Sequence, residues 1–251
     1  MGTVSLTLSF VFIIIFVALN IVGAALSATI NVIYSGQILL LLVFFLFLLF
    51  YAQKNKLKNI IGLTKISSYD IKANLFYVPL IIIVLTNGVF FFDKTIPFLD
   101  IFMVIPFMAL VAFIEEFLFR GLLLKAIEER RNTKTAVIIS GLTFGFGHII
   151  NLLIGYTGIS QIIQIILAVL IGTVLSVLFV RTKSIVPGII FHFFFNIASA
   201  LSAEVEPLQN YIMVGIIIAI SSVYLAYLLR KEFFKHPQRL SIIYKMANSK
   251  Q

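Results

Sequence analysis

Residues 108–124 read MALVAFIEEFLFRGLLL, and this stretch decides the fold. A membrane-spanning helix needs about 20 mostly apolar residues, and the surrounding sequence supplies them, yet the stretch also contains Glu115, Glu116 and Arg120. A charged residue at the centre of a spanning helix costs roughly 2.5–3.5 kcal/mol. Charges at that depth normally face the interior of a helical bundle and pair with one another. The stretch therefore predicts a bundle of membrane helices built around a buried polar cluster.

The composition of the whole chain also favours a membrane protein. Of its 251 residues, 61% are hydrophobic and only 12% are charged, and the mean hydropathy is +1.12. A soluble domain is roughly half apolar and a quarter charged, and it could not bury this much apolar surface. Cysteine is absent, which excludes disulfides, thiolate metal ligands and a cysteine nucleophile.

We expect an all-α fold, namely a polytopic membrane helical bundle of about eight transmembrane helices. Residues 1–251 are expected to form a single transmembrane domain. The predicted spans cover residues 6–26, 36–52, 73–92, 100–124, 136–152, 160–180, 185–201 and 210–229.

Basic residues are concentrated on one side of these predicted spans. Seventeen of the 19 Lys and Arg residues lie on that side, and the exceptions are Lys94 and Arg120. The seventeen are Lys54, Lys56, Lys58, Lys65 and Lys72; Lys125, Arg130, Arg131 and Lys134; Arg181 and Lys183; and Arg230, Lys231, Lys235, Arg239, Lys245 and Lys250.

The positive-inside rule places that basic side in the cytoplasm. Both termini of a multi-pass protein of the cell membrane are then cytoplasmic, which requires an even number of spans. The net charge of +9 is explained by these loops, and we expect no nucleic-acid partner. Residues 54–72 and the basic cytoplasmic tail at 230–251 mix basic with apolar residues, so both are expected to lie on the anionic leaflet of the bilayer as amphipathic helices.

Two other predicted spans carry polar side chains. His148 follows Gly141 and Gly145, whose small-xxx-small spacing lets another helix approach closely. His192 and Asn196 are four residues apart and therefore share one helix face.

The same spacing makes Glu116 and Arg120 an expected ion pair. Glu115 points about 100° away from Glu116 around the helix. An open alternative is that all three charges form one structural ion network.

The depth of these side chains permits a single site reached from the cytoplasm. Depth is measured along each helix from its nearest basic residue, at ~1.5 Å per residue. Glu115 and His192 lie ~15 and ~14 Å deep, and His148 and Asn196 lie ~21 and ~20 Å deep. Three helices thus place their polar groups within a layer ~7 Å thick.

A carboxylate, two imidazoles and a carboxamide are groups that hydrolases use. Glu or His can accept a proton from water, and His and Asn can donate hydrogen bonds to an oxyanion. Glu115, His148 and His192 could instead ligate a metal such as zinc, although the zinc-helix signature with two His four residues apart is absent. A third alternative is an ion or proton transporter with a Glu and His relay, but no internal repeat is evident.

Three motifs resemble those of the CAAX-processing and bacteriocin-processing (CPBP, or Abi) family, whose eukaryotic relative is the type II CAAX prenyl endopeptidase. They are Glu115-Glu116-x-x-x-Arg120, Phe144-x-x-x-His148 and His192-x-x-x-Asn196. Their order and spacing agree with the family over residues 100–201, which would be its catalytic helices.

The resemblance implies an intramembrane endopeptidase that cleaves a membrane-associated peptide or protein. Glu115 and His148 would activate water, and His192 with Asn196 would stabilise the oxyanion. Glu116 and Arg120 would support these four. The family has been described as glutamate-dependent and as metal-dependent, so zinc stays open as a cofactor.

The resemblance also suggests biological roles. Bacterial members are associated with bacteriocin immunity, peptide maturation and membrane-protein partners. The alternative within the same fold is a non-catalytic membrane adaptor, which would have no need of Glu115.

The charge distribution yields a test of topology. A reporter that is active only outside the cytoplasm is expected to stay silent when it is fused after Gln251. The same reporter inserted beside Lys94 serves as the control and is expected to be active. An active reporter after Gln251 would remove the model with both termini in the cytoplasm.

Overall fold

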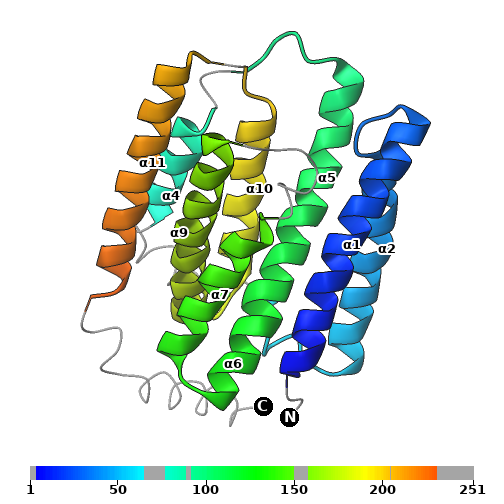
Figure 1. Ribbon diagram of the computed structural model, residues 1–251. Coiled ribbons are helices and arrows are strands. Elements are labelled where there is room, and N and C mark those ends of the chain that lie inside the picture. The colour runs from blue at the N-terminus through cyan, green and yellow to red at the C-terminus, as the bar shows by residue number, and fades with distance from the viewer. Residues whose placement is uncertain (1–3, 65–76, 89–91, 150–157, 204, 231–251) are drawn as a thin grey trace.

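The computed structural model of the chain describes residues 4–64, 77–88, 92–149, 158–203 and 205–230 (Figure 1). These residues are helical apart from turns and one isolated β-bridge. The helices are α1 (Leu6–Ile30), α2 (Ser35–Lys54), α4 (Val78–Thr86), α5 (Phe98–Glu116), the π-helix η3 (Phe117–Leu124), α6 (Lys125–Arg130), α7 (Thr133–Gly147), α9 (Ile159–Thr182), α10 (Val186–Ala200) and α11 (Pro207–Leu228). The predicted all-α polytopic bundle is confirmed.

Each of the eight predicted spans contains a helix. Among the described residues, five helices are long and apolar enough to cross a membrane: Leu6–Ile30, Ser35–Lys54, Phe98–Arg130, Gln161–Thr182 and Pro207–Leu228. Three helices are shorter, since α10 and α7 have 15 residues each and α4 has nine. The predicted span 136–152 continues past the end of α7, but residues 150–152 lie outside the described residues.

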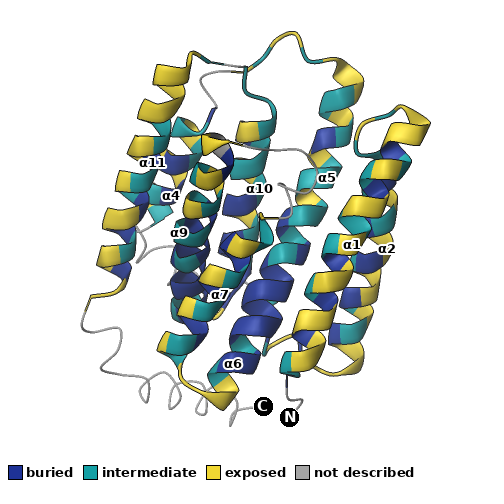
Figure 2. Cartoon of the chain, in the orientation of Figure 1, coloured by how far each residue is buried: buried dark blue, intermediate teal, exposed yellow. Residues whose placement is uncertain are grey.

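The continuous helix formed by α5 and η3 is the centre of the bundle. It packs against α1, α2, α7 and α10, and all eight residues of η3 are buried. The outer faces of α1, α2 and α11 are exposed instead (Figure 2), although they are apolar: Ile14 is 67% exposed and Val223 is 71% exposed. This distribution suits a protein whose solvent is the bilayer, because lipid covers apolar side chains without penalty.

Close packing of α7 on α9 depends on two glycines, as the small-xxx-small spacing predicts. A Cβ atom on Gly141 would lie 3.1 Å from the Cα atom of Thr173. One on Gly145 would lie 2.8 Å from the backbone nitrogen of Val169. The two backbones therefore approach so closely that only glycine fits on α7 at these positions.

The basic residues of the described chain gather at one end of the bundle. α1 begins and α11 ends there, together with the ends of α2 and α9 and the junction of α6 with α7 (Figure 1). We call it the basic end, and its described residues are Lys54, Lys56, Lys58, Lys125, Arg130, Arg131, Lys134, Arg181, Lys183 and Arg230. The predicted separation of basic segments from the opposite end thus holds for the described chain.

We expected residues 54–72 to form a helix on the membrane surface, and this prediction is wrong for the described residues up to Thr64. Residues beyond Lys54 form turns up to Thr64, and Ile61 is fully buried against Gly121 of η3. The Ile185 N–H donates to the carbonyl of Gly62 at 3.0 Å. The apolar residues of this segment therefore face the protein core instead of lipid. The expected helix in the tail falls on residues 231–251, which lie outside the described residues.

The glycine contacts between α7 and α9 yield a prediction for stability. Gly145→Ala is expected to destabilise the protein by about 1–3 kcal/mol, because overpacking forces two backbones apart. Thermal unfolding in detergent micelles measures the loss. Gly215→Ala on α11 is the matched control, since a Cβ atom there meets nothing within 4 Å and alanine favours a helix. Equal unfolding temperatures for the two variants would contradict the packing argument.

Candidate active site

Glu115 and Glu116 lie where α5 passes into the π-helix η3. Arg120 of η3 donates from Nη1 to Oε1 of Glu116 at 2.7 Å. Both side chains are buried, Glu116 at 1% and Arg120 at 0% exposure. The ion pair predicted from their spacing is confirmed, and it neutralises two charges that would each be costly at this depth.

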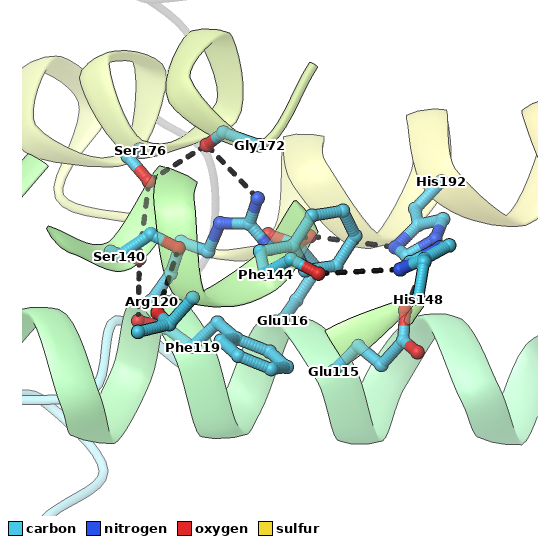
Figure 3. Close-up of polar contacts among 11 residues, drawn as sticks. Glu115, Glu116, Phe119, Arg120, Ser140, Phe144, His148, Gly172, Ser176 and His192 are labelled. Carbon is cyan, nitrogen blue, oxygen red and sulfur yellow. Dashed lines mark hydrogen bonds and ion pairs between the residues drawn. The ribbon is translucent and has the colours of Figure 1, made fainter. Parts of the chain in front are cut away.

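The guanidinium of Arg120 also ties η3 to α9. Its Nη2 donates to the carbonyl of Gly172 at 3.0 Å. Ser176 Oγ lies 2.8 Å from the same carbonyl and 3.2 Å from Ser140 Oγ of α7. Four elements thus meet in one buried polar network (Figure 3).

Ser140 joins α7 to the π-helix η3. In a π-helix the N–H groups bond five residues back. Ser140 Oγ donates to the carbonyl of Phe119 at 3.0 Å. Sequence reasoning missed Ser140 and Ser176, and their position within apolar spans is the signal that could have found them.

His192 of α10 lies between the two carboxylates. Its Nε2 is 3.3 Å from Oε2 of Glu115, and its Nδ1 is 3.5 Å from Oε1 of Glu116. Gly188, one turn earlier on α10, makes this approach possible, because a Cβ atom there would lie 2.5 Å from Oε2 of Glu116. Glu115 therefore points away from Arg120, as expected, and it meets an imidazole.

His148 lies beside this pair, at the C-terminal end of α7. Its Nδ1 is 3.2 Å from the carbonyl oxygen of Phe144, an arrangement that favours a proton on Nδ1 and a free lone pair on Nε2. The helix ends here in a tighter turn, in which the His148 N–H bonds to Gly145 and its carbonyl accepts from Gln161 Nε2 at 3.0 Å. His148 interacts electrostatically with Glu115, so three of the four predicted side chains come together (Figure 3).

Asn196 is the predicted residue that the structure leaves apart. It lies one turn beyond His192 on α10 and is half-buried. Its side chain makes no hydrogen bond to the residues that the structure describes. The face shared with His192 is therefore present, but no contact with Glu115 or His148 accompanies it.

The metal-ligand set that the sequence leaves open is Glu115, His148 and His192. No three His, Asp or Glu residues of the described chain are grouped so that they could hold a metal ion. Glu115 and His192 face each other at 3.3 Å, and His148 directs its Nδ1 to a backbone carbonyl.

Comparison with known proteins identifies the region that contains these residues. Residues 97–198 match the family described as type II CAAX prenyl endopeptidase Rce1-like. Over these residues the chain is similar to the CAAX-type membrane proteases. The match begins with α5 and ends within α10, so it includes every residue of the three motifs. No curated protein and no solved structure gives a significant match.

At the level of the family, this match supports an intramembrane endopeptidase of the CAAX type. The buried polar network lies inside the matched region, and Arg120, Gly172 and Ser176 belong to helices that are long enough to cross a bilayer.

The buried ion pair yields a prediction for stability. Arg120→Ala leaves Glu116 charged and unpaired, which is expected to cost about 3–5 kcal/mol. Protein abundance in membranes and the unfolding temperature in detergent are expected to fall together.

The matched control removes both charges. Glu116→Gln combined with Arg120→Met leaves no unpaired ion, so this double variant is expected to recover most of the stability. An Arg120→Ala protein as stable as the wild type would show that the pair does not stabilise the fold.

Proposed function

We propose that the chain is an intramembrane endopeptidase that hydrolyses a peptide bond in a membrane-associated peptide or protein, with water activated by Glu115 and His148. One observation carries the proposal: Glu115 contacts His192 at 3.3 Å and has His148 beside it, within the region that matches the endopeptidase family. A purely structural ion network would require only Glu116 and Arg120, which already balance each other.

Glu115 is the proposed general base. Its side chain is 13% exposed, against 1% for Glu116, so it is the carboxylate with room for water. His148 keeps the Nε2 lone pair available because its Nδ1 bonds to Phe144. Water held between Glu115 and His148 would lose a proton to Glu115 as its oxygen attacks the peptide carbonyl carbon.

His192 is the proposed oxyanion donor, with Asn196 as its partner. Its ring nitrogens face the two carboxylates. An imidazole N–H can stabilise a developing oxyanion by donating a hydrogen bond to it. The unbonded amide of Asn196, one turn away on the same face, is free to donate to the same oxygen.

Collapse of the tetrahedral intermediate completes the reaction. The peptide C–N bond breaks, and the proton taken up by Glu115 passes to the leaving amine. One water is consumed, and the products are a carboxylate and an amine. Bacteriocin immunity or peptide maturation is the proposed biological setting, with the site reached from a cytoplasmic basic end.

Mutation of the proposed base gives the first test. Glu115→Ala and His148→Ala are each expected to abolish cleavage of a peptide by the purified protein. Groups that act as a unit show non-additive losses, so the double variant is expected to be hardly slower than either single variant. Asn196→Ala is expected to retain residual activity, because one oxyanion donor is typically worth ~10²–10³ in rate.

Controls separate chemistry from folding and from metal dependence. All of these variants are expected to insert and unfold near the wild-type temperature, and a chelator is expected to leave the wild-type rate unchanged. Full activity in Glu115→Ala would end this mechanism. Activity that a chelator removes and zinc restores would make Glu115, His148 and His192 metal ligands, and wild-type protein that lacks any cleavage would favour the adaptor or the transporter.

A further inference from the structure

The ring of Phe144 lies between the buried ion pair and the two imidazoles (Figure 3). The Cζ atom of Arg120 is 4.4 Å from its centroid. The ring centroid of His192 lies 5.6 Å from that of Phe144, with an angle of 73° between the ring planes. The ring centroid of His148 lies 5.3 Å from it, with an angle of 56° between the planes. One aromatic side chain therefore touches the cation of the network and both candidate catalytic imidazoles.

Arg120 needs a contact of this kind because its hydrogen bonds are incomplete. A guanidinium has five N–H donors, and the side chain is fully buried. Bonds to Glu116 and Gly172 use Nη1 and Nη2, while Nε has no hydrogen-bond partner among the described residues. The face of an aromatic ring carries negative potential, which attracts a cation strongly when water is excluded.

The backbone around the ring holds it in place. A Cβ atom on Gly172 would lie 2.8 Å from Cδ1 of Phe144, so α9 packs directly against the ring. The ring of Phe119 in η3 packs edge-on against Phe144, with 5.3 Å between the two ring centroids. Phe144 is only 3% exposed, and it is therefore out of reach of a peptide substrate.

We propose that Phe144 is a positioning residue, whose ring face holds the Arg120 guanidinium in the orientation that fixes Glu116 and, through it, His192. The link is a single oxygen: Oε1 of Glu116 accepts from Arg120 at 2.7 Å and lies 3.5 Å from Nδ1 of His192. Nδ1 of His192 has no hydrogen-bond partner among the described residues, so Oε1 acts on it as a nearby negative charge. A guanidinium that turned away would move that charge. The proposal rests on the function proposed above, because it assigns the effect to His192.

Fluorinated phenylalanines at position 144 test the electrostatic part of this contact. Fluorine withdraws charge from the ring face and changes the size of the ring little, so one, two and three fluorines weaken the attraction to Arg120 in steps. Both kcat and the unfolding temperature are expected to fall in the same order, with kcat reduced roughly tenfold by three fluorines. KM is expected to stay constant, since the ring does not reach the substrate.

Two controls test whether the graded effect depends on the positive charge of Arg120. The same series at Phe117, which is fully buried in the π-helix η3 and has no cation over its ring in the described chain, is expected to show no graded effect. In the Glu116→Gln, Arg120→Met background, the graded fall of unfolding temperature at position 144 is expected to disappear.

The readouts separate this inference from the proposed function. A flat unfolding series at position 144, or an equal slope at Phe117, overturns the contact even if Glu115-dependent cleavage is present. A graded unfolding series with constant kcat overturns the positioning function and leaves a structural contact. Wild-type protein without Glu115-dependent cleavage overturns the proposed function, and the unfolding series then reports the ring–cation contact alone.

Discussion

The buried pair of Glu116 and Arg120 is the constraint on which the rest of the structure depends. Neither charge can remain unpaired in a bilayer, and pairing alone leaves several donors of the guanidinium unsatisfied. The remaining contacts come from other helices, because Gly172 of α9 supplies a carbonyl and Phe144 of α7 supplies a ring face. Gly188 of α10 leaves room for the carboxylate. A single ion pair thereby fixes how four helices approach one another.

This pairing also separates the behaviour of two adjacent carboxylates. Glu116 has Arg120 as its counter-ion and is sealed from solvent. Glu115, one residue earlier, faces another direction around the helix, where it meets His192 and has His148 beside it. Identical side chains therefore have different surroundings, which is the usual way in which a protein gives two carboxylates different functions. The ion pair makes this division possible, since Arg120 would otherwise compete with His192 for Glu115.

The sequence could predict whatever depends on spacing within one helix. The spans follow from apolar length, the Glu116–Arg120 pair follows from a four-residue interval, and the close α7–α9 contact follows from Gly141 and Gly145. What it could not predict depends on contacts between helices. Ser140 of α7 donates a hydrogen bond to the π-helix, and Ile61 and Gly62 are buried against η3 and α9 although the composition of their segment suits a membrane surface. No local pattern reveals these partners.

The bilayer explains why the site and the scaffold use the same contacts. Helices in lipid gain little from burying apolar surface against one another, because lipid is equally apolar, so polar bonds and close backbone packing must specify their arrangement. In this chain both are concentrated around Arg120: hydrogen bonds join η3 to α9, and glycines bring α7 and α9 together. The interactions that assemble the bundle are thus the ones that orient Glu116 and His192. A substitution in this network should therefore change stability and site geometry together, whereas Glu115 and His148, at its margin, can be altered with little effect on the fold.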